Sequence, residues 1–417
     1  MKPKKESGPK LQRFELSEKN AKLRWILVVV LLAVASVALV SCLTTALGTE
    51  AGWQSVEVIS SELHCGDDFV LRYDFGAAGM SATAENKQLT QLYSTAVERA
   101  YVLFRGVDPD EAVGNLSHIN SNINTVVIVD PALYAALSQV QQQGSRLLYL
   151  GPAYAEYGRI FRSMTQDEAI TYDPVQNPEQ LEYLQSIAAY AADPEMVELE
   201  LLGQNQVRLT VAAEYASFAK ANELEAFVDF GWLTNAFVAD YLAGVLEENG
   251  FTNGYLSSFD GFTRNLDTRG SSYSLNIFDR YEDSIYLPAV MQYQSPAAIV
   301  YLRNYPMSEK DAVLYYSFPD SHIVTPYVRL EDARYETATD NLVSWSKSDG
   351  CGQVALQMAE VFLQKELDAN ALNGLVSDGI YSIWFQDTTL YCNDPALTLQ
   401  MQQTEGVSYT HQAVIAN

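Results

Sequence analysis

Histidine and cysteine are scarce in this sequence, which has four of each among 417 residues. The histidines stand at positions 64, 118, 322 and 411, and neither residue type occurs at the C-x₂₋₄-C or H-x₃₋₅-H spacing of zinc sites. A zinc site is therefore not expected. Three of the cysteines, Cys65, Cys351 and Cys392, follow the apolar run near the N-terminus, and an odd number allows at most one internal disulfide.

Basic side chains are half as frequent as acidic ones, with 26 Lys and Arg against 52 Asp and Glu. Residues 1–24 nevertheless carry a net charge of +5, and the remaining chain carries −31. Such an acidic domain repels the phosphates of nucleic acids and of anionic lipids. Nucleic acid is therefore excluded as a partner, and the basic segment is expected in different surroundings from the rest.

An uncharged run of 23 residues extends from Trp25 to Leu47, long enough to cross a bilayer core of roughly 30 Å. We predict a transmembrane helix over residues 25–47 in the cytoplasmic membrane. The positive-inside rule then makes residues 1–24 a cytoplasmic tail and residues 50–417 an extracytoplasmic domain. Residues 39–42 (LVSC) resemble a lipoprotein cleavage box, so a lipid anchor at Cys42 is the alternative tether. Because exported domains keep disulfides, we expect Cys351 to pair with Cys392.

Residues 50–417 contain no internal repeat and no low-complexity linker, which predicts one domain. Helical spacing of apolar residues predicts helices over 84–104, 130–140 and 179–192. Alternation and turn residues predict strands within 197–211, 272–278, 284–289, 298–302 and 312–318. This order predicts an α+β fold in which antiparallel sheets are flanked by helices.

Residues 226–262 carry the clearest pattern of the chain. Phe227 and Val228 end an apolar run, residues 233–248 have helical spacing, and Tyr255 begins a second apolar run. The pattern predicts a compact β-α-β unit whose helix N-terminus favours an anionic group. Well-packed core without a ligand is the alternative interpretation of the same pattern.

This stretch resembles the central motif of the FAD:protein FMN transferase (ApbE-like) family, D-L-G-G-I-A-K-G-Y-A-V-D followed after a helix by G-V-T-N-A-L-V-N-x-G-G-D. Residues 229–240 (DFGWLTNAFVAD) and 250–253 (GFTN) fall on these motifs in frame. Trp232 stands at the second glycine, Asn235 at the lysine, and Phe259 and Asp260 at the later glycine pair. The resemblance implies an ApbE-like fold and extends in element order over residues 85–392.

The same resemblance implies candidate site residues. Those for flavin binding are Asp229, Thr234, Asn235, Ser257 and Ser258. Those for catalysis are His322 and Asp260, because residues 322–329 (HIVTPYVR) are similar to the family's H-I-I-D-P-R-T-G. A structural role is the alternative for His322, since one imidazole without a carboxylate partner in the sequence defines no mechanism.

The family holds its divalent cation with the Asp and Thr of a helix that reads A-D-A-L-A-T-A-L. In the helix predicted over 352–363, Gln353 and Gln357 stand at these positions. An amide oxygen brings no negative charge, so we expect no standard Mg²⁺ site there. The alternative ligands are carboxylates elsewhere in the sequence, namely Asp229, Asp240, Asp260 or Asp349.

Two functions are compatible with this pattern. The first is a membrane-anchored, extracytoplasmic ApbE-like pseudoenzyme that binds a ligand, or a membrane or exported protein, without standard Mg-dependent FMN transfer. The alternative is an FMN transferase that uses FAD and Mg²⁺ in a rearranged site and attaches FMN to a Thr or Ser of a membrane or exported acceptor. The spacing of the family's motifs is kept in this sequence, whereas residues at their charged positions differ. This combination favours the first function.

Overall fold

The computed structural model describes residues 49–60, 64–77, 79–106, 108–282 and 284–414. No helix in these ranges is both long and apolar enough to span a membrane. The transmembrane helix expected over 25–47 and the lipid anchor at Cys42 lie outside the described residues and stay predictions. The contacts divide the chain at Glu50, and the part from Ala51 onward is described as one unit.

The helices are distributed along the whole of this unit. Their bounds are α2 Ala82–Phe104, α3 Leu116–Ser121, α4 Pro131–Gln142, α5 Gly151–Phe161, α6 Gln166–Tyr172, α7 Pro178–Ala192, α8 Ala213–Ala221, α9 Thr234–Glu248, α10 Cys351–Phe362 and α11 Ala369–Gly374. Side chains cap most of them in the expected way: Ser81 accepts from the backbone of α2, and Asp130 precedes the proline that opens α4.

A nine-stranded sheet organises the unit, with strand order β1-β2-β6-β7-β10-β13-β14-β15-β17. Its strands are β1 Gly52–Val56, β2 Phe69–Phe75, β6 Gly254–Ser258, β7 Phe262–Asn265, β10 Ala297–Arg303, β13 Asn341–Ser346, β14 Ile380–Gln386, β15 Thr389–Cys392 and β17 Thr410–Ala413. Neighbouring strands are antiparallel except for β15 and β17.

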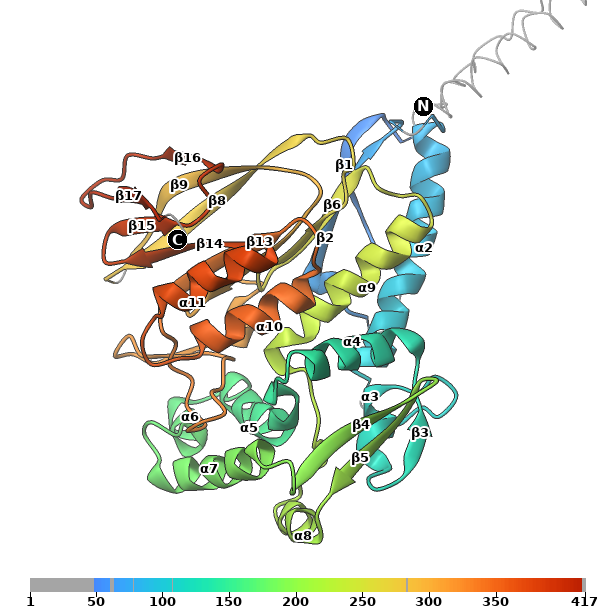
Figure 1. The fold of residues 1–417 in the computed structure, drawn as a ribbon, viewed down its shortest axis with the longest axis vertical. Coiled ribbons are helices and arrows are strands. Elements are labelled where there is room, and N and C mark those ends of the chain that lie inside the picture. Colours follow the sequence, from blue (N-terminus) through green and yellow to red (C-terminus); the bar gives the residue numbers. More distant parts are fainter. Residues whose placement is uncertain (1–48, 61–63, 78, 107, 283, 415–417) are drawn as a thin grey trace, which may run out of the picture. The chain divides into compact units, whose positions relative to one another are not determined.

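Helices cover one face of this sheet (Figure 1): α2 contacts β1 and β2, α9 contacts β6 and β7, and α10 contacts β10 and β13. The first six residues of α9 are all buried, because the helix packs between the sheet, α2 and α10. The N-terminus of α9 is therefore held inside the unit.

A second sheet, in the order β16-β9-β8, packs on the other face of the large sheet. Its strands are β8 Ser272–Tyr281, β9 Ser284–Gln294 and β16 Thr398–Met401. The shared core includes Ile277, Met291, Ile299, Trp345 and Ile383. Strand β10 is consequently buried on both faces, whereas Trp53 on β1 keeps an exposed fraction of 41%. The second sheet thus leaves the β1 side of the large sheet partly open.

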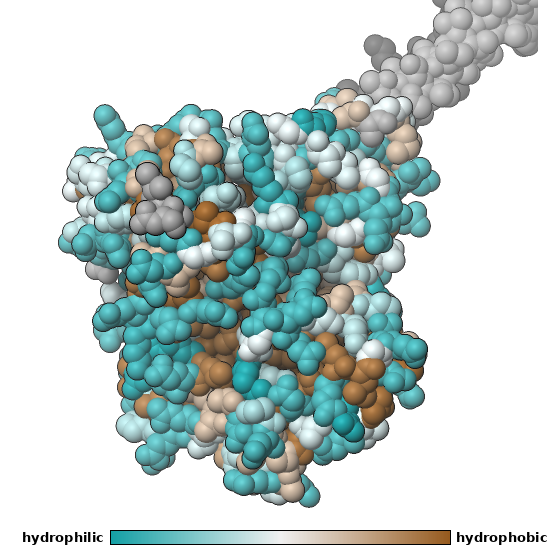
Figure 2. All heavy atoms as spheres, in the orientation of Figure 1, coloured by the Kyte–Doolittle hydropathy of each residue, from teal (hydrophilic) through white to brown (hydrophobic). Residues whose placement is uncertain are grey.

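Two smaller sheets complete the unit. One has the order β3-β5-β4, with β3 Val126–Ile128, β4 Val197–Gly203 and β5 Gln206–Val211, and the other pairs β11 Tyr316–Ser317 with β12 Ile323–Val324. Hydrophilic residues cover most of the face shown in Figure 2, and hydrophobic residues show in separate patches among them.

The α+β prediction is confirmed, and so are the helices now seen as α2, α4, α7, α9 and α10 and the strands β4, β5, β6, β8, β9 and β10. The prediction of a first strand in the β-α-β unit is wrong, because residues 226–230 form no regular secondary structure. The Asn120 side-chain amide exchanges hydrogen bonds of 2.9 and 3.0 Å with the backbone of Val228. The backbone N–H of Asp229 donates to the Leu148 carbonyl. One side chain and one carbonyl therefore replace a strand ladder.

Two other predictions are wrong. Of residues 312–318, only Tyr316–Ser317 forms a strand, because Asp311 accepts the backbone N–H groups of Met307 and Ser308 and holds the chain in a turn just before. The disulfide is absent as well: Cys351 donates its thiol to the Thr263 carbonyl, Cys392 donates to the Asp394 carbonyl, and both are free and buried.

Candidate functional site

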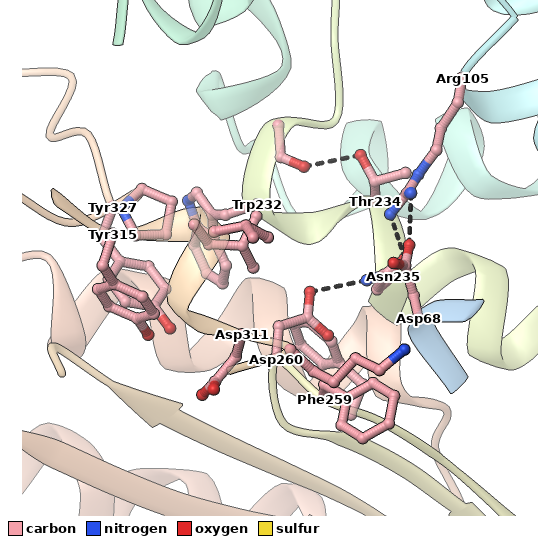
Figure 3. A pocket seen from close by; sticks show the side chains of 16 residues that line it. Asp68, Arg105, Trp232, Thr234, Asn235, Phe259, Asp260, Asp311, Tyr315 and Tyr327 are labelled. Carbon is pink, nitrogen blue, oxygen red and sulfur yellow. Dashed lines mark hydrogen bonds and ion pairs between the residues drawn. The ribbon is translucent and has the colours of Figure 1, made fainter. Parts of the chain in front are cut away.

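A cavity of about 250 Å³ lies beside the N-terminus of α9 (Figure 3). Its walls are largely aromatic, formed by Trp232, Phe259, Phe262, Tyr315 and Tyr327. Its charged lining residues are Asp68, Arg105, Asp260, Lys310 and Asp311. Segments far apart in the sequence, three of which carry motif residues (229–235, 257–260 and 322–329), therefore meet around one space.

A hydrogen-bonded chain crosses the cavity from Asp68 to Asp260. Arg105 donates from Nη1 to Asp68 Oδ2 at 2.5 Å and from Nη2 to Asn235 Oδ1 at 2.6 Å. Asn235 then donates from Nδ2 to Asp260 Oδ2 at 2.9 Å. Both polar atoms of the Asn235 side-chain amide are thereby engaged, the oxygen by the guanidinium and the nitrogen by the carboxylate.

The turn before α9 explains why glycine precedes Trp232. Gly231 takes φ +56°, and a Cβ there would lie 2.4 Å from the Tyr154 ring, so the backbone conformation and the available space both require glycine. Asp229 accepts the Gly231 N–H at 2.6 Å and stabilises the turn. Where the resemblance predicts a second glycine, the Trp232 indole instead forms the cavity wall and packs edge-on against Tyr327 at 5.1 Å between ring centroids.

Two buried polar atoms at the cavity lack partners among the described residues: Asp260 Oδ1 and Trp232 Nε1. Burial raises the pKa of Asp260, while interactions with the side chains of Ser258 and Asn235 oppose the shift. An unpaired buried polar atom costs about 1–3 kcal/mol, which a ligand that supplies its partner recovers. The residues of the lining thus include one unpartnered acceptor and one unpartnered donor.

The opposite wall is fixed by Arg303. Its Nη2 donates to the Phe259 carbonyl and to Asp311 Oδ2, both at 3.0 Å, and its carbonyl accepts the Tyr315 hydroxyl at 2.9 Å. Lys310 places its ammonium 5.6 Å from the centre of the Phe259 ring. Because Arg105 and Arg303 are engaged by protein groups, Lys310 is the cation of the described lining that remains most available to a ligand.

The structure brings together three of the residues implied by the resemblance: Thr234, Asn235 and Asp260 all line the cavity. The other three flavin candidates do not line it. Asp229 lies behind the Gly231 turn with its pKa raised by burial, Ser257 bonds Thr263 on the outer face of β6, and Ser258 accepts the Phe262 N–H.

His322 also lies away from the lining. Its Nε2 is hydrogen bonded to the Tyr335 hydroxyl, which donates to Asp173 at 2.9 Å. The imidazole stacks on the Phe318 ring at 5.2 Å between centroids. This Asp173–Tyr335–His322 chain ties the end of α6 to the segments on both sides of β12, so the geometry supports a structural role for His322.

The residues at the metal positions do not fit Mg²⁺. Gln353 and Gln357 supply only neutral amide oxygens, although Gln357 Oε1 is buried without a partner among the described residues. Asp240 caps α10, accepting the N–H groups of Cys351 and Gly352 at 2.8 Å, and Asp349 accepts the Ser346 hydroxyl. No group of three or more His, Cys, Asp or Glu side chains suited to a metal occurs in the described part of the chain.

Sequence reasoning missed much of the charged lining. Asp68, Arg105, Lys310 and Asp311 come from segments that carry no recognisable motif, and only their position in space connects them with Asn235. The available signals were weak: an arginine just past the end of a predicted helix, and a Lys-Asp pair before an apolar run.

Comparison with known proteins defines the fold. No family model matches, and no curated protein matches by sequence. The structure of the ApbE protein from Thermotoga maritima matches with a TM-score of 0.53 at 9% identity, over 80% of this chain and 94% of that chain. The flavin transferase ApbE from Vibrio cholerae gives 0.49 at 14% identity, over 84% and 97%. Apo flavinyl transferase ApbE from Pseudomonas stutzeri gives 0.47 at 9%, over 84% and 94%.

At such identities the likeness shows the fold alone, and it rests on the Thermotoga structure. The described unit is an α+β domain whose central sheet is covered by helices on one face. That domain has the ApbE-like fold, as the motif resemblance implied.

Proposed function

We propose that this chain is an ApbE-like protein that binds a ligand in the cavity at Asn235 and Asp260 and lacks standard Mg-dependent FMN transfer. The observation that carries the proposal is the donor set at the cation positions, Gln353 and Gln357, together with the engagement of Asp240 and Asp349 elsewhere. Phosphoryl transfer depends almost wholly on positioning and on neutralising charge, so a site without charged metal ligands loses the main catalytic contribution.

The cavity itself supports ligand binding. Aromatic walls and two unpartnered polar atoms of lining residues, Asp260 Oδ1 and Trp232 Nε1, suit a planar ring that has both a hydrogen-bond donor and an acceptor. A flavin ring has these properties and is the candidate that the fold suggests. A diphosphate suits the site less well, because Arg105 is already paired with Asp68 and Asn235 and the domain is strongly acidic.

The proposal includes an extracytoplasmic position, with residues 25–47 as membrane anchor and a membrane or exported protein as partner. The charge change between the +5 leader and the −31 remainder supports this orientation. Protease added to intact protoplasts should remove residues 50–417, and full protection of that domain would contradict the orientation.

The activity test is incubation of the purified protein with FAD, Mg²⁺ and a flavin-acceptor domain, followed by in-gel flavin fluorescence. We expect no covalent labelling, whereas an active ApbE flavin transferase run in parallel should label the acceptor. Flavin titration without Mg²⁺ tests binding separately, with Asp260→Asn as the variant expected to bind less tightly. Mg²⁺-dependent labelling by the unmodified protein would establish the alternative, an FMN transferase with a rearranged site.

A further inference from the structure

A second hollow, of about 560 Å³, lies on the outer face of β1, β2 and β6. It is lined by Trp53, Arg72, Asp74, Tyr255, Arg269 and residues 271–274, none of which lines the first cavity. Trp53 is paired across the strands with Asp74, and Arg72 with Tyr255, so these side chains share one face of the sheet. The start of β8 in the second sheet borders the hollow through residues 272–274 and leaves Trp53 exposed.

Three contacting aromatic rings, of which Trp53 is the exposed one, form a platform in this hollow. The Trp53 ring lies 6.0 Å from Tyr255, tilted by 40°, and 6.0 Å from Tyr273, which it meets edge-on at 87°. The two tyrosine rings are 6.1 Å apart and also edge-on, so the tyrosines support the Trp53 ring and do not extend its plane. Trp53 is 41% exposed, whereas the other tryptophans of the described residues, Trp232, Trp345 and Trp384, are at most 8% exposed. A large aromatic surface kept in water beside polar groups is typical of a recognition site.

The polar groups around the platform are held in place from below. Asp267 is fully buried and accepts two hydrogen bonds from the Arg269 guanidinium, at 2.9 and 3.0 Å, one from the Arg269 backbone N–H at 2.8 Å, and one from the Tyr273 hydroxyl at 2.7 Å. Arg269 also donates to Asp74 at 2.8 Å. The guanidinium and one edge of the platform are thereby pre-oriented, which lowers the entropy lost when a ligand binds.

Arg72 adds a donor that is largely unused. Within the described residues its guanidinium makes one long contact, 3.5 Å to the Ser55 hydroxyl. The charges of the hollow nearly balance, since Arg72 and Arg269 face Asp74 and the buried Asp267. A cationic ligand would meet two guanidinium groups, and an anionic polymer would meet the −31 charge of the domain. A neutral ligand with many hydroxyl groups avoids both penalties.

We propose that this hollow binds a neutral β-linked sugar chain built of glucose or N-acetylglucosamine units. The flat C–H face of such a sugar stacks on the exposed Trp53 ring, while its hydroxyl groups receive and donate hydrogen bonds at Arg72, Arg269 and Asp74. The assignment is independent of the ligand of the first cavity and of any flavin chemistry.

The test uses the full chain in lauryldimethylamine oxide, a detergent without a sugar headgroup, titrated calorimetrically with chitohexaose and with cellohexaose. We expect saturable binding of at least one hexasaccharide. Trp53→Ala should weaken it about tenfold, and Trp53→Phe should recover most of the loss, because a stacked aromatic ring contributes on the order of that factor. Tyr281→Ala is the matched control, since Tyr281 is an exposed aromatic residue of the same strand as Tyr273 but lies outside the hollow.

Three results would overturn the proposal. The first is that neither hexasaccharide binds the unmodified protein. The second is equal binding by Trp53→Ala and the unmodified protein while both melt at the same temperature. The third is binding of phosphatidylglycerol vesicles, but of neither sugar, that is lost in Trp53→Ala, which would assign the hollow to lipid phosphate instead.

Discussion

Arg105 donates a hydrogen bond of 2.6 Å to Oδ1 of Asn235, although 130 positions separate the two residues. Position 235 is where the motif resemblance predicts a lysine. The positive charge absent from that position is thus supplied in space by an arginine at the end of α2. Asp68 and Asn235 both hold this guanidinium, so the charged cavity wall depends on three distant segments of the chain.

The first prediction concerns this pair. Arg105→Met and Asn235→Ala should each lower the unfolding free energy, and together they should show a coupling of about 1 kcal/mol, because the guanidinium is about one-third exposed and water partly replaces its bonds. Urea unfolding of the four proteins measures the coupling. Arg99→Met, which removes a pair with Asp130 away from the cavity, is the control and should show no coupling with Asn235→Ala.

The second prediction restores the charge at the cation positions. Gln353→Asp combined with Gln357→Thr places a carboxylate and a hydroxyl one helical turn apart on α10, so the double variant should gain measurable Mg²⁺ binding. Calorimetry and a Mg²⁺-dependent rise in melting temperature detect it. Gln353→Asn with Gln357→Thr lacks the charge and should stay insensitive to Mg²⁺. If the Asp–Thr variant is equally insensitive, the surroundings of α10 differ from a cation site in more than these two residues.

The third prediction concerns Asp279, which accepts hydrogen bonds from Asn341 and Tyr409. Burial raises its pKa to about 6. Between about pH 4 and 6 the folded protein therefore binds a proton that the unfolded chain has released, so the unfolding free energy falls as pH rises through this window, by about 3 kcal/mol.

Asp279→Asn should remove most of this slope and raise stability at pH 7.5, because it eliminates the buried charge while the Tyr409 hydroxyl keeps an acceptor. Urea unfolding from pH 4 to 8 measures the effect. Asp387→Asn, at an exposed turn between β14 and β15, is the matched control and should keep the slope of the unmodified protein. An unchanged slope in Asp279→Asn would assign the pH dependence to another group.

The fourth prediction concerns the start of α10. Asp240 accepts two backbone N–H groups of that helix and the Arg264 guanidinium at 2.6 Å. Asp240→Ala should cost about 3 kcal/mol, because Arg264 loses its main buried partner, and Asp240→Asn should cost less. Gly350→Ala should also destabilise, since its Cβ would lie 2.3 Å from Asp240 Oδ2. Thermal and urea unfolding measure these changes, and an Asp349→Ala loss as large as that of Asp240→Ala would contradict this assignment of the cap.

The sequence predicted what local periodicity controls. Apolar spacing located α2, α7 and α9 to within a few residues, and the motif frame placed Thr234, Asn235 and Asp260 in one neighbourhood. Prediction from the sequence failed where tertiary contacts, and not the local residue pattern, determine the backbone conformation. Residues 226–228 look like a strand, yet the Asn120 side chain satisfies the backbone of Val228. Arg105, at the end of α2, and Lys310 reach the cavity only through the tertiary fold, a relationship that no spacing within one segment encodes.

The unpaired thiols of Cys65, Cys351 and Cys392 have a practical consequence. All three are buried, and burial raises the pKa of each, to about 12 for Cys65 and about 11 for Cys392. Alkylating reagents attack the thiolate, so each of these sulfurs is protected while its own segment stays closed. Labelling rates at the three positions would therefore report how often the turn before β2, the start of α10 and the end of β15 open independently under native conditions.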